Sequence, residues 1–129
     1  MTEGTKKKIL VVDDNVNFLD LVSLVFEEEF AILKAENGEE GMALVRRELP
    51  DVILLDVMMP KVSVIEMLRE LQSDLDTRSI PVIVLTANNF DQTTMAMFQR
   101  EVNVKSFLKK PCAIEKLRSE IAQVLAKTA

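Results

Sequence analysis

Short runs of consecutive apolar residues alternate along this chain with longer segments whose apolar residues recur at helical spacing. Runs of this kind are typical of strands buried on both faces of a sheet. Their alternation with helices predicts right-handed βαβ crossovers and one parallel sheet covered on both faces. Strands are predicted at residues 8–12, 30–35, 52–56, 81–86 and 104–108, and helices at residues 16–26, 39–48, 64–73, 90–102 and 113–126.

For the first and fourth predicted helices, the sequence also predicts which face is buried. Asp14 or Asn15 is the expected N-cap of the first helix. Helical spacing then predicts one inward face, which leaves Val16 and Leu19 on the outward side. The predicted inward residues are Phe18, Leu21, Val22, Val25 and Phe26 in the first helix, and Met95, Phe98 and Val102 in the fourth.

Length and composition narrow the class of protein. The 129 residues are interpreted as a single domain spanning residues 1–129, with residues 1–7 as a flexible lead. The lone Cys112 excludes an intramolecular disulfide and, with apolar runs too short to span a bilayer, predicts a cytoplasmic protein without a membrane segment. A net charge of −5 argues against direct nucleic-acid binding, and the absence of histidine excludes His bases and His metal ligands.

Polar residues follow the ends of several predicted strands. Asp13 and Asp14 follow the first strand, Asp56 ends the central one, Thr86 ends the fourth and Lys110 follows the fifth. Because ligands bind beyond the carboxyl ends of parallel strands, these residues are expected to form one site. Clustered carboxylates capture a hard cation such as Mg²⁺, and a lysine and a hydroxyl beside it suit phosphoryl transfer. Asp56, at the centre of the sheet, is the expected nucleophile.

Four segments carry these residues: 11–15 (VVDDN), 54–60 (LLDVMMP), 84–87 (VLTA) and 107–111 (FLKKP). Together they resemble the signature blocks of the response-regulator receiver domain (CheY-like) of two-component signalling. The resemblance runs from about Lys8 to Lys127, and four blocks in this order and spacing are a specific signal. It implies an α/β fold, a (βα)5 doubly wound five-stranded parallel sheet of flavodoxin or CheY type with strand order 2-1-3-4-5.

The resemblance also implies a phosphoacceptor and a metal site. Asp56 matches the phosphoacceptor, Asp14 a direct Mg²⁺ ligand and Asp13 a ligand through water. The backbone carbonyl of Met58 matches a further metal ligand, beside Asp56 itself.

Other matched residues are implied to read the phosphoryl group. Lys110, which immediately precedes the proline, would contact the acyl phosphate. Thr86 and Phe107 would be the switch pair, with the hydroxyl moving to the phosphoryl oxygen and the ring filling the vacated space. Ala87 matches the small residue that admits the phosphodonor, whereas Lys109 is interpreted as a solvated charge and Cys112 as a small unreactive hydrophobe.

Two positions depart from the family pattern. Val64 replaces the usual glycine, and because a β-branched residue resists positive φ, the loop at residues 61–64 is expected to differ locally. Asn103 replaces a glycine before the last strand and is expected to tolerate the left-handed conformation.

The resulting hypothesis is a phosphorylation-controlled switch. A histidine kinase or phosphotransfer protein would donate to Asp56, and the face built from the fourth helix, last strand and last helix would respond. The chain would catalyse only its own phosphotransfer and autodephosphorylation. Output would pass to a downstream effector protein or to an output domain outside this sequence, and phosphorylation-dependent dimerisation stays open. As a further hypothesis, Val16 and Leu19 form an apolar patch that docks the helical phosphodonor domain.

Two alternatives remain from the residues alone. One is a phosphorylation-independent scaffold, which the departure at Val64 permits. The other is a small Mg²⁺-dependent phosphohydrolase with Asp56 as nucleophile. Such enzymes carry an acid two residues after the nucleophile, where this chain has Met58, so the sequence disfavours this alternative.

Overall fold

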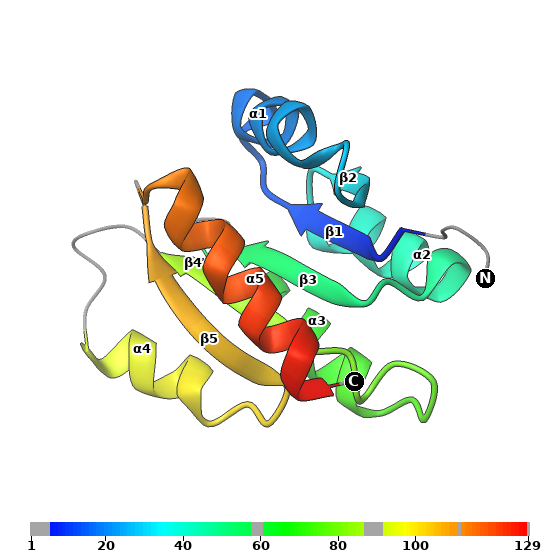
Figure 1. Cartoon of the computed structure of the whole chain (residues 1–129). Helices are drawn as coiled ribbons and strands as arrows, with labels where there is room; N and C mark the ends of the chain where they lie inside the picture. The colour runs from blue at the N-terminus through cyan, green and yellow to red at the C-terminus, as the bar shows by residue number, and fades with distance from the viewer. Residues whose placement is uncertain (1–5, 58–60, 87–91, 111, 129) are drawn as a thin grey trace.

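The computed structural model describes residues 6–57, 61–86, 92–110 and 112–128, which form one parallel sheet with its crossover helices (Figure 1). The strand order is β2-β1-β3-β4-β5, as predicted. The elements are β1 (Lys8–Val12), α1 (Val16–Phe26), β2 (Ala31–Ala35), α2 (Gly38–Glu48), β3 (Val52–Asp56), α3 (Lys61–Gln72), β4 (Val82–Thr86), α4 (Gln92–Gln99), β5 (Val104–Lys109) and α5 (Ile114–Thr128).

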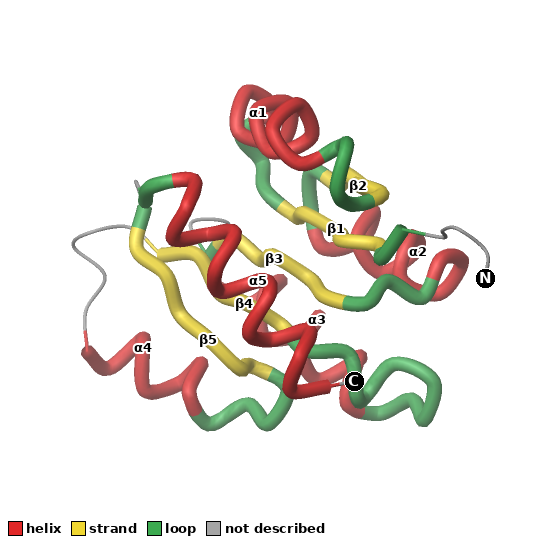
Figure 2. Tube along the Cα trace, viewed as in Figure 1, coloured by secondary structure: helices red, strands yellow, loops and turns green. Residues whose placement is uncertain are grey.

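Helices cover both faces of the sheet (Figure 2). Side chains alternate between the faces of a strand, so each strand contributes to two cores. In β3, Val52 and Leu54 pack with α1 and α5, whereas Ile53 and Leu55 pack with α2, α3 and α4. This double burial explains why the central strands are uninterrupted apolar runs. It also explains why the one carboxylate of β3, that of Asp56, stands at the end of the strand.

The orientation of α1 differs from the prediction. Leu19 is buried, at 2% exposed, whereas Leu21 is 47% exposed, so the prediction was wrong for both residues. Val16 is exposed, as expected. The buried stripe is Leu19, Val22 and Phe26, rotated by about one residue from the predicted face. Because apolar residues occur nearly all around this helix, periodicity did not single out one face, and packing against the sheet decided it.

The start of α1 and the end of α4 differ in part from the prediction. The side chain of Asn15 caps α1 by accepting from the backbone N–H groups of Asn17 and Phe18, which selects Asn15 over Asp14 as N-cap. The fourth helix ends at Gln99, earlier than predicted. Val102 therefore lies in the following turn and is 67% exposed, so its predicted inward position was wrong.

The two departures from the family pattern have different outcomes. Val64 lies inside α3, is 1% exposed and has no positive φ, as expected for a β-branched residue, but α3 begins at Lys61 and not at the predicted residue 64. Asn103 is not left-handed, because Leu49 is the one described non-glycine residue with positive φ. Instead the buried Asn103 amide donates to the Leu68 carbonyl and accepts from Gln72.

Leu49 ends α2 in the left-handed conformation, with φ 49° and half of its surface exposed. This conformation costs a leucine roughly 1–2 kcal/mol, a cost that glycine avoids, so Leu49→Gly should stabilise the protein by about 0.5–1 kcal/mol. Urea unfolding measures the difference. The matched control is the exposed Ala43→Gly inside the same helix, which should destabilise by about 1 kcal/mol. A lower urea midpoint for Leu49→Gly than for the wild type would refute the prediction.

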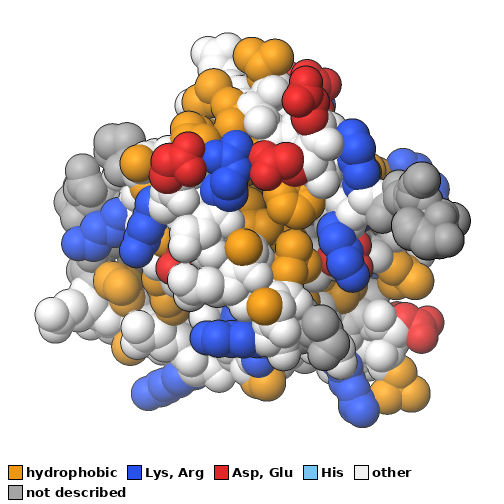
Figure 3. Space-filling model, viewed as in Figure 1, with side chains coloured by type: hydrophobic (Ala, Val, Ile, Leu, Met, Phe, Trp, Pro, Cys, Tyr) orange, Lys and Arg blue, Asp and Glu red, His pale blue; other side chains and the backbone are white. Residues whose placement is uncertain are grey.

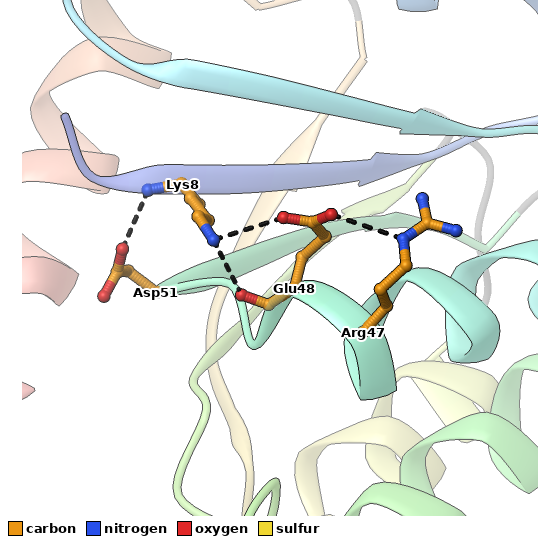
Figure 4. Close-up of polar contacts among 4 residues, drawn as sticks. All are labelled: Lys8, Arg47, Glu48 and Asp51. Carbon is orange, nitrogen blue, oxygen red and sulfur yellow. Dashed lines mark hydrogen bonds and ion pairs between the residues drawn. The ribbon is translucent and has the colours of Figure 1, made fainter. Parts of the chain in front are cut away.

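Opposite the carboxyl ends of the strands, a polar cluster ties β1 to the end of α2 (Figure 4). The Lys8 ammonium donates to the Glu48 backbone carbonyl at 3.1 Å and carboxylate at 3.2 Å, and the Lys8 backbone N–H donates to Asp51 at 2.7 Å. Hydrogen bonds from Lys8 and then Arg47 lower the pKa of Glu48 below its ordinary value.

None of the helices in the described part of the chain has the length and the apolar composition that crossing a bilayer requires.

Candidate functional site

Three carboxylates meet at the carboxyl edge of the sheet. Asp13 and Asp14 directly follow β1, and Asp56 ends β3. The two strands are neighbours, with Val12 opposite Leu55, so the residues that follow lie side by side. One carboxylate oxygen from each of the three residues lies within 4.8 Å of the others. Asp13 and Asp56 are buried and Asp14 is exposed, so the group opens to solvent on the side of Asp14.

Lys110 brings a positive charge to these acids from the end of β5. Its Nζ lies 2.6 Å from Oδ2 of Asp13 and 3.6 Å from Oδ1 of Asp56. Its backbone N–H donates to the Thr86 carbonyl, which ties the residue to the end of β4. A lysine placed between two buried carboxylates offsets their mutual repulsion, and it can contact an anion bound to either of them.

The Asp13 carboxylate is held from two sides. Its Oδ1 accepts from the Asn15 backbone N–H at 2.8 Å, and its Oδ2 accepts from Lys110. The Asp13 backbone N–H donates to the Ala35 carbonyl at 3.0 Å. The loop after β1 and Lys110 together therefore fix the orientation of this carboxylate.

The predicted switch residues lie on neighbouring strands. Thr86 is buried, and its hydroxyl donates to the Leu108 carbonyl at 3.4 Å, a long hydrogen bond. Phe107 is half-buried and packs against the core beneath α3 and α4. The hydroxyl is thus held by a weak contact to β5, the strand that carries the ring. The predicted roles of Met58 and Ala87 lie outside the described residues.

The acidic group fits a hard cation. The three side chains supply only oxygen atoms, and Mg²⁺ accepts one or two carboxylates and keeps several waters. The exposed Asp14 and the buried Asp56 contribute the two carboxylates of this group that do not form the shortest ion pair, which joins Lys110 to Asp13.

Phe18 is a neighbour of the site that was not predicted as one. It was assigned to the core and does pack against the core beneath α1 and α5, half-buried, but its ring centroid also lies 4.2 Å from Nζ of Lys110. Phe18 also lines an apolar groove between α1 and α5, together with Leu21, Cys112, Ile114 and Leu117. Burial raises the pKa of the Cys112 thiol, as expected for an unreactive hydrophobe. No motif marks Phe18, since only the tertiary approach of α1 to the end of β5 brings it to the lysine.

Comparison with known sequences places these residues in a family context. The family model of the response regulator receiver domain matches residues 9–122. Protein PilH of Pseudomonas aeruginosa is 38% identical over 120 residues, which cover 92% of this chain and 98% of PilH. The phosphate regulon transcriptional regulatory protein PhoB of the same species is 33% identical over 123 residues, 95% of this chain and 53% of PhoB. The chain thus spans nearly all of PilH and about half of PhoB.

Solved structures agree with the fold. The receiver domain of a signal transduction histidine kinase from Syntrophus aciditrophicus has a TM-score of 0.82 at 28% identity, over 94% of this chain and 91% of that one. A CheY-like receiver domain protein from Methanospirillum hungatei has a TM-score of 0.84 at 22% identity, over 96% and 97% of the two chains.

Proposed function

The chain belongs to the response regulator receiver domain family of two-component signalling, and on that premise we propose that Asp56 accepts a phosphoryl group from a protein phosphohistidine. Receiver domains are signalling modules and not classical enzymes. The observation that carries the proposal is the buried Asp56 carboxylate at the carboxyl end of the central strand, with two further aspartates and Lys110 beside it. In the transfer, the phosphorus–nitrogen bond of the donor breaks and an Asp56 Oδ–phosphorus bond forms.

Mg²⁺ is the proposed cofactor. Asp13, Asp14 and Asp56 would hold it, and when bound it would supply positive charge for the phosphoryl oxygens. The chain's own part is to orient and neutralise. The backbone-held Asp13 keeps Lys110 within 3.6 Å of Asp56, where the ammonium can contact a phosphoryl oxygen.

The proposed response uses the weakly held hydroxyl of Thr86. A phosphoryl oxygen on Asp56 is a stronger acceptor than the Leu108 carbonyl at 3.4 Å, so the hydroxyl would turn toward it. The half-buried Phe107 would then move into the vacated space, and the face formed by α4, β5 and α5 would change its contacts with an effector protein or output domain.

The phosphodonor would dock on the groove between α1 and α5. Apolar side chains are visible on α1 and along its junction with α5 (Figure 3). The exposed Leu21 and the half-buried Phe18 and Ile114 line this groove beside Lys110. A helix of a histidine kinase or phosphotransfer domain has the shape to lay an apolar face there, close to Asp56. This surface replaces the predicted patch, because Leu19 is buried.

Leu21→Glu should slow phosphorylation by a protein donor about tenfold more than phosphorylation by acetyl phosphate, because a charge in the groove opposes docking of an apolar helix. The donor is a phosphorylated phosphotransfer domain first shown to transfer to the wild-type protein. The control is Leu24→Glu, which adds the same charge at an exposed position of α1 outside the groove. Equal slowing with both donors, or equal slowing by both variants, would count against the docking surface.

Beryllofluoride, a mimic of the acyl phosphate, tests the proposed function. Amide NMR shifts that require Mg²⁺ should appear near Asp56, Thr86 and Phe107 and extend into α5. A wild-type protein without any response would instead favour a phosphorylation-independent scaffold.

A further inference from the structure

We propose that Phe18 is a positioning residue for Lys110: its aromatic face holds the ammonium group over the acidic site, so that the phosphoryl group meets a lysine already in place. The inference rests on the proposed function and deepens it. It concerns how this chain keeps Lys110 in place before a donor arrives.

The contacts of Lys110 define its position from three directions. Nζ lies 2.6 Å from Asp13, 3.6 Å from Asp56 and 4.2 Å from the centroid of the Phe18 ring. An ammonium within about 6 Å of a ring centroid is attracted to the negative face of the ring. The lysine side chain is 22% exposed, and the ring lies against one side of its ammonium group.

The cap of α1 fixes the backbone from which the Phe18 ring projects. Asn15 caps α1 through its side chain, which accepts from the Phe18 backbone N–H at 3.3 Å. The Asn15 backbone N–H in turn donates to Asp13, the acid that pairs with Lys110. One short loop thus fixes the anion and the backbone position of the residue whose ring meets the same ammonium.

The Phe18 contact matters most when Mg²⁺ binds to the acids. Lys110 is attached through a flexible four-carbon stem, and binding of Mg²⁺ at Asp13 would weaken its shortest ion pair. The Phe18 ring bears no charge and does not compete for the metal, so it continues to hold the ammonium near Asp56. Without the ring, the lysine would have the open groove between α1 and α5 available to it.

Acetyl phosphate tests this role, because a small donor needs no docking surface. Phe18→Met keeps apolar volume but removes the ring, and it should lower the maximal phosphorylation rate about tenfold with a change below about twofold in the half-saturating acetyl phosphate concentration. Phe18→Trp keeps a ring face and should stay within about twofold of the wild type. Leu24→Met, at an exposed position on the same helix, controls for changes in α1.

Fluorescence gives a second readout that does not depend on phosphorylation. The chain has no Trp or Tyr, so Phe18→Trp introduces its one indole. Adding Lys110→Met to this variant should change the indole emission, since the ammonium leaves the ring, whereas adding Lys109→Met should not.

The outcomes separate the two proposals. A wild-type protein that accepts no phosphoryl group would overturn both. The positioning role alone would be overturned if the wild type is phosphorylated and Phe18→Met is phosphorylated at the same rate. It would also be overturned if the indole emission of Phe18→Trp does not change when Lys110 is replaced. Slow Phe18→Met rescued by tryptophan supports it.

Discussion

Asp56→Asn should abolish phosphorylation by acetyl phosphate, with a rate at least about a hundredfold below that of the wild type. Asn has nearly the shape of Asp, and residue 56 is 1% exposed, so the fold should tolerate the change while the nucleophilic carboxylate is lost. Mass spectrometry of the intact protein measures the phosphoprotein fraction. The Mg²⁺-dependent NMR shifts with beryllofluoride should disappear in the same variant.

The control for Asp56→Asn is Asp20→Asn on α1. Asp20 is exposed, pairs with Lys34 of β2 and does not belong to the acidic group of Asp13, Asp14 and Asp56, so its removal changes the net charge by the same amount without touching the site. Phosphorylation of Asp20→Asn should proceed at the wild-type rate. An Asp56→Asn protein that gains phosphate as fast as the wild type would place the acceptor on another residue.

Lys110→Met should destabilise the metal-free protein by about 2–3 kcal/mol. Removal of the ammonium takes away the positive charge that offsets the buried carboxylates of Asp13 and Asp56, and breaking a buried ion pair from one side is costly. Because no ammonium then competes with a cation for these acids, saturating Mg²⁺ should stabilise the variant more than it stabilises the wild type. Urea unfolding with EDTA and with Mg²⁺ measures both differences.

Lys109→Met is the matched control for Lys110→Met. Lys109 is the neighbouring residue, is exposed and was interpreted from the sequence as a solvated charge. Its replacement should change stability by no more than about 0.5 kcal/mol, with or without Mg²⁺. If Lys110→Met were as stable as Lys109→Met in EDTA, the ion pair would contribute nothing to the metal-free fold.

The sheet and the position of the site were predictable because both depend on patterns that are local in sequence. Uninterrupted apolar runs such as residues 52–55 can be buried only between two layers, and helical spacing between them requires parallel crossovers. Polar residues directly after such runs must then gather at one edge. Asp13, Asp14, Asp56 and Lys110 do so in the structure, while their individual roles stay predictions.

The buried face of α1 was not predictable from periodicity. Leu19 and Leu21 are equally apolar, and apolar residues continue around the helix, so several faces satisfy the same spacing. Contact with the sheet selected Leu19. The buried amide of Asn103 is a similar case, since its partners Leu68 and Gln72 are more than thirty residues away, and a left-handed backbone was only one use of an asparagine there.

The sequence by itself determined the doubly wound sheet, the edge at which chemistry can occur and the residue types present there. Only the tertiary structure decided which face of α1 is buried, that α3 begins at Lys61, and that the Phe18 ring meets Lys110. The physical reason is range: strand burial and strand-end polarity are properties of consecutive residues, whereas Phe18 and Lys110 become neighbours only when α1 packs beside the end of β5.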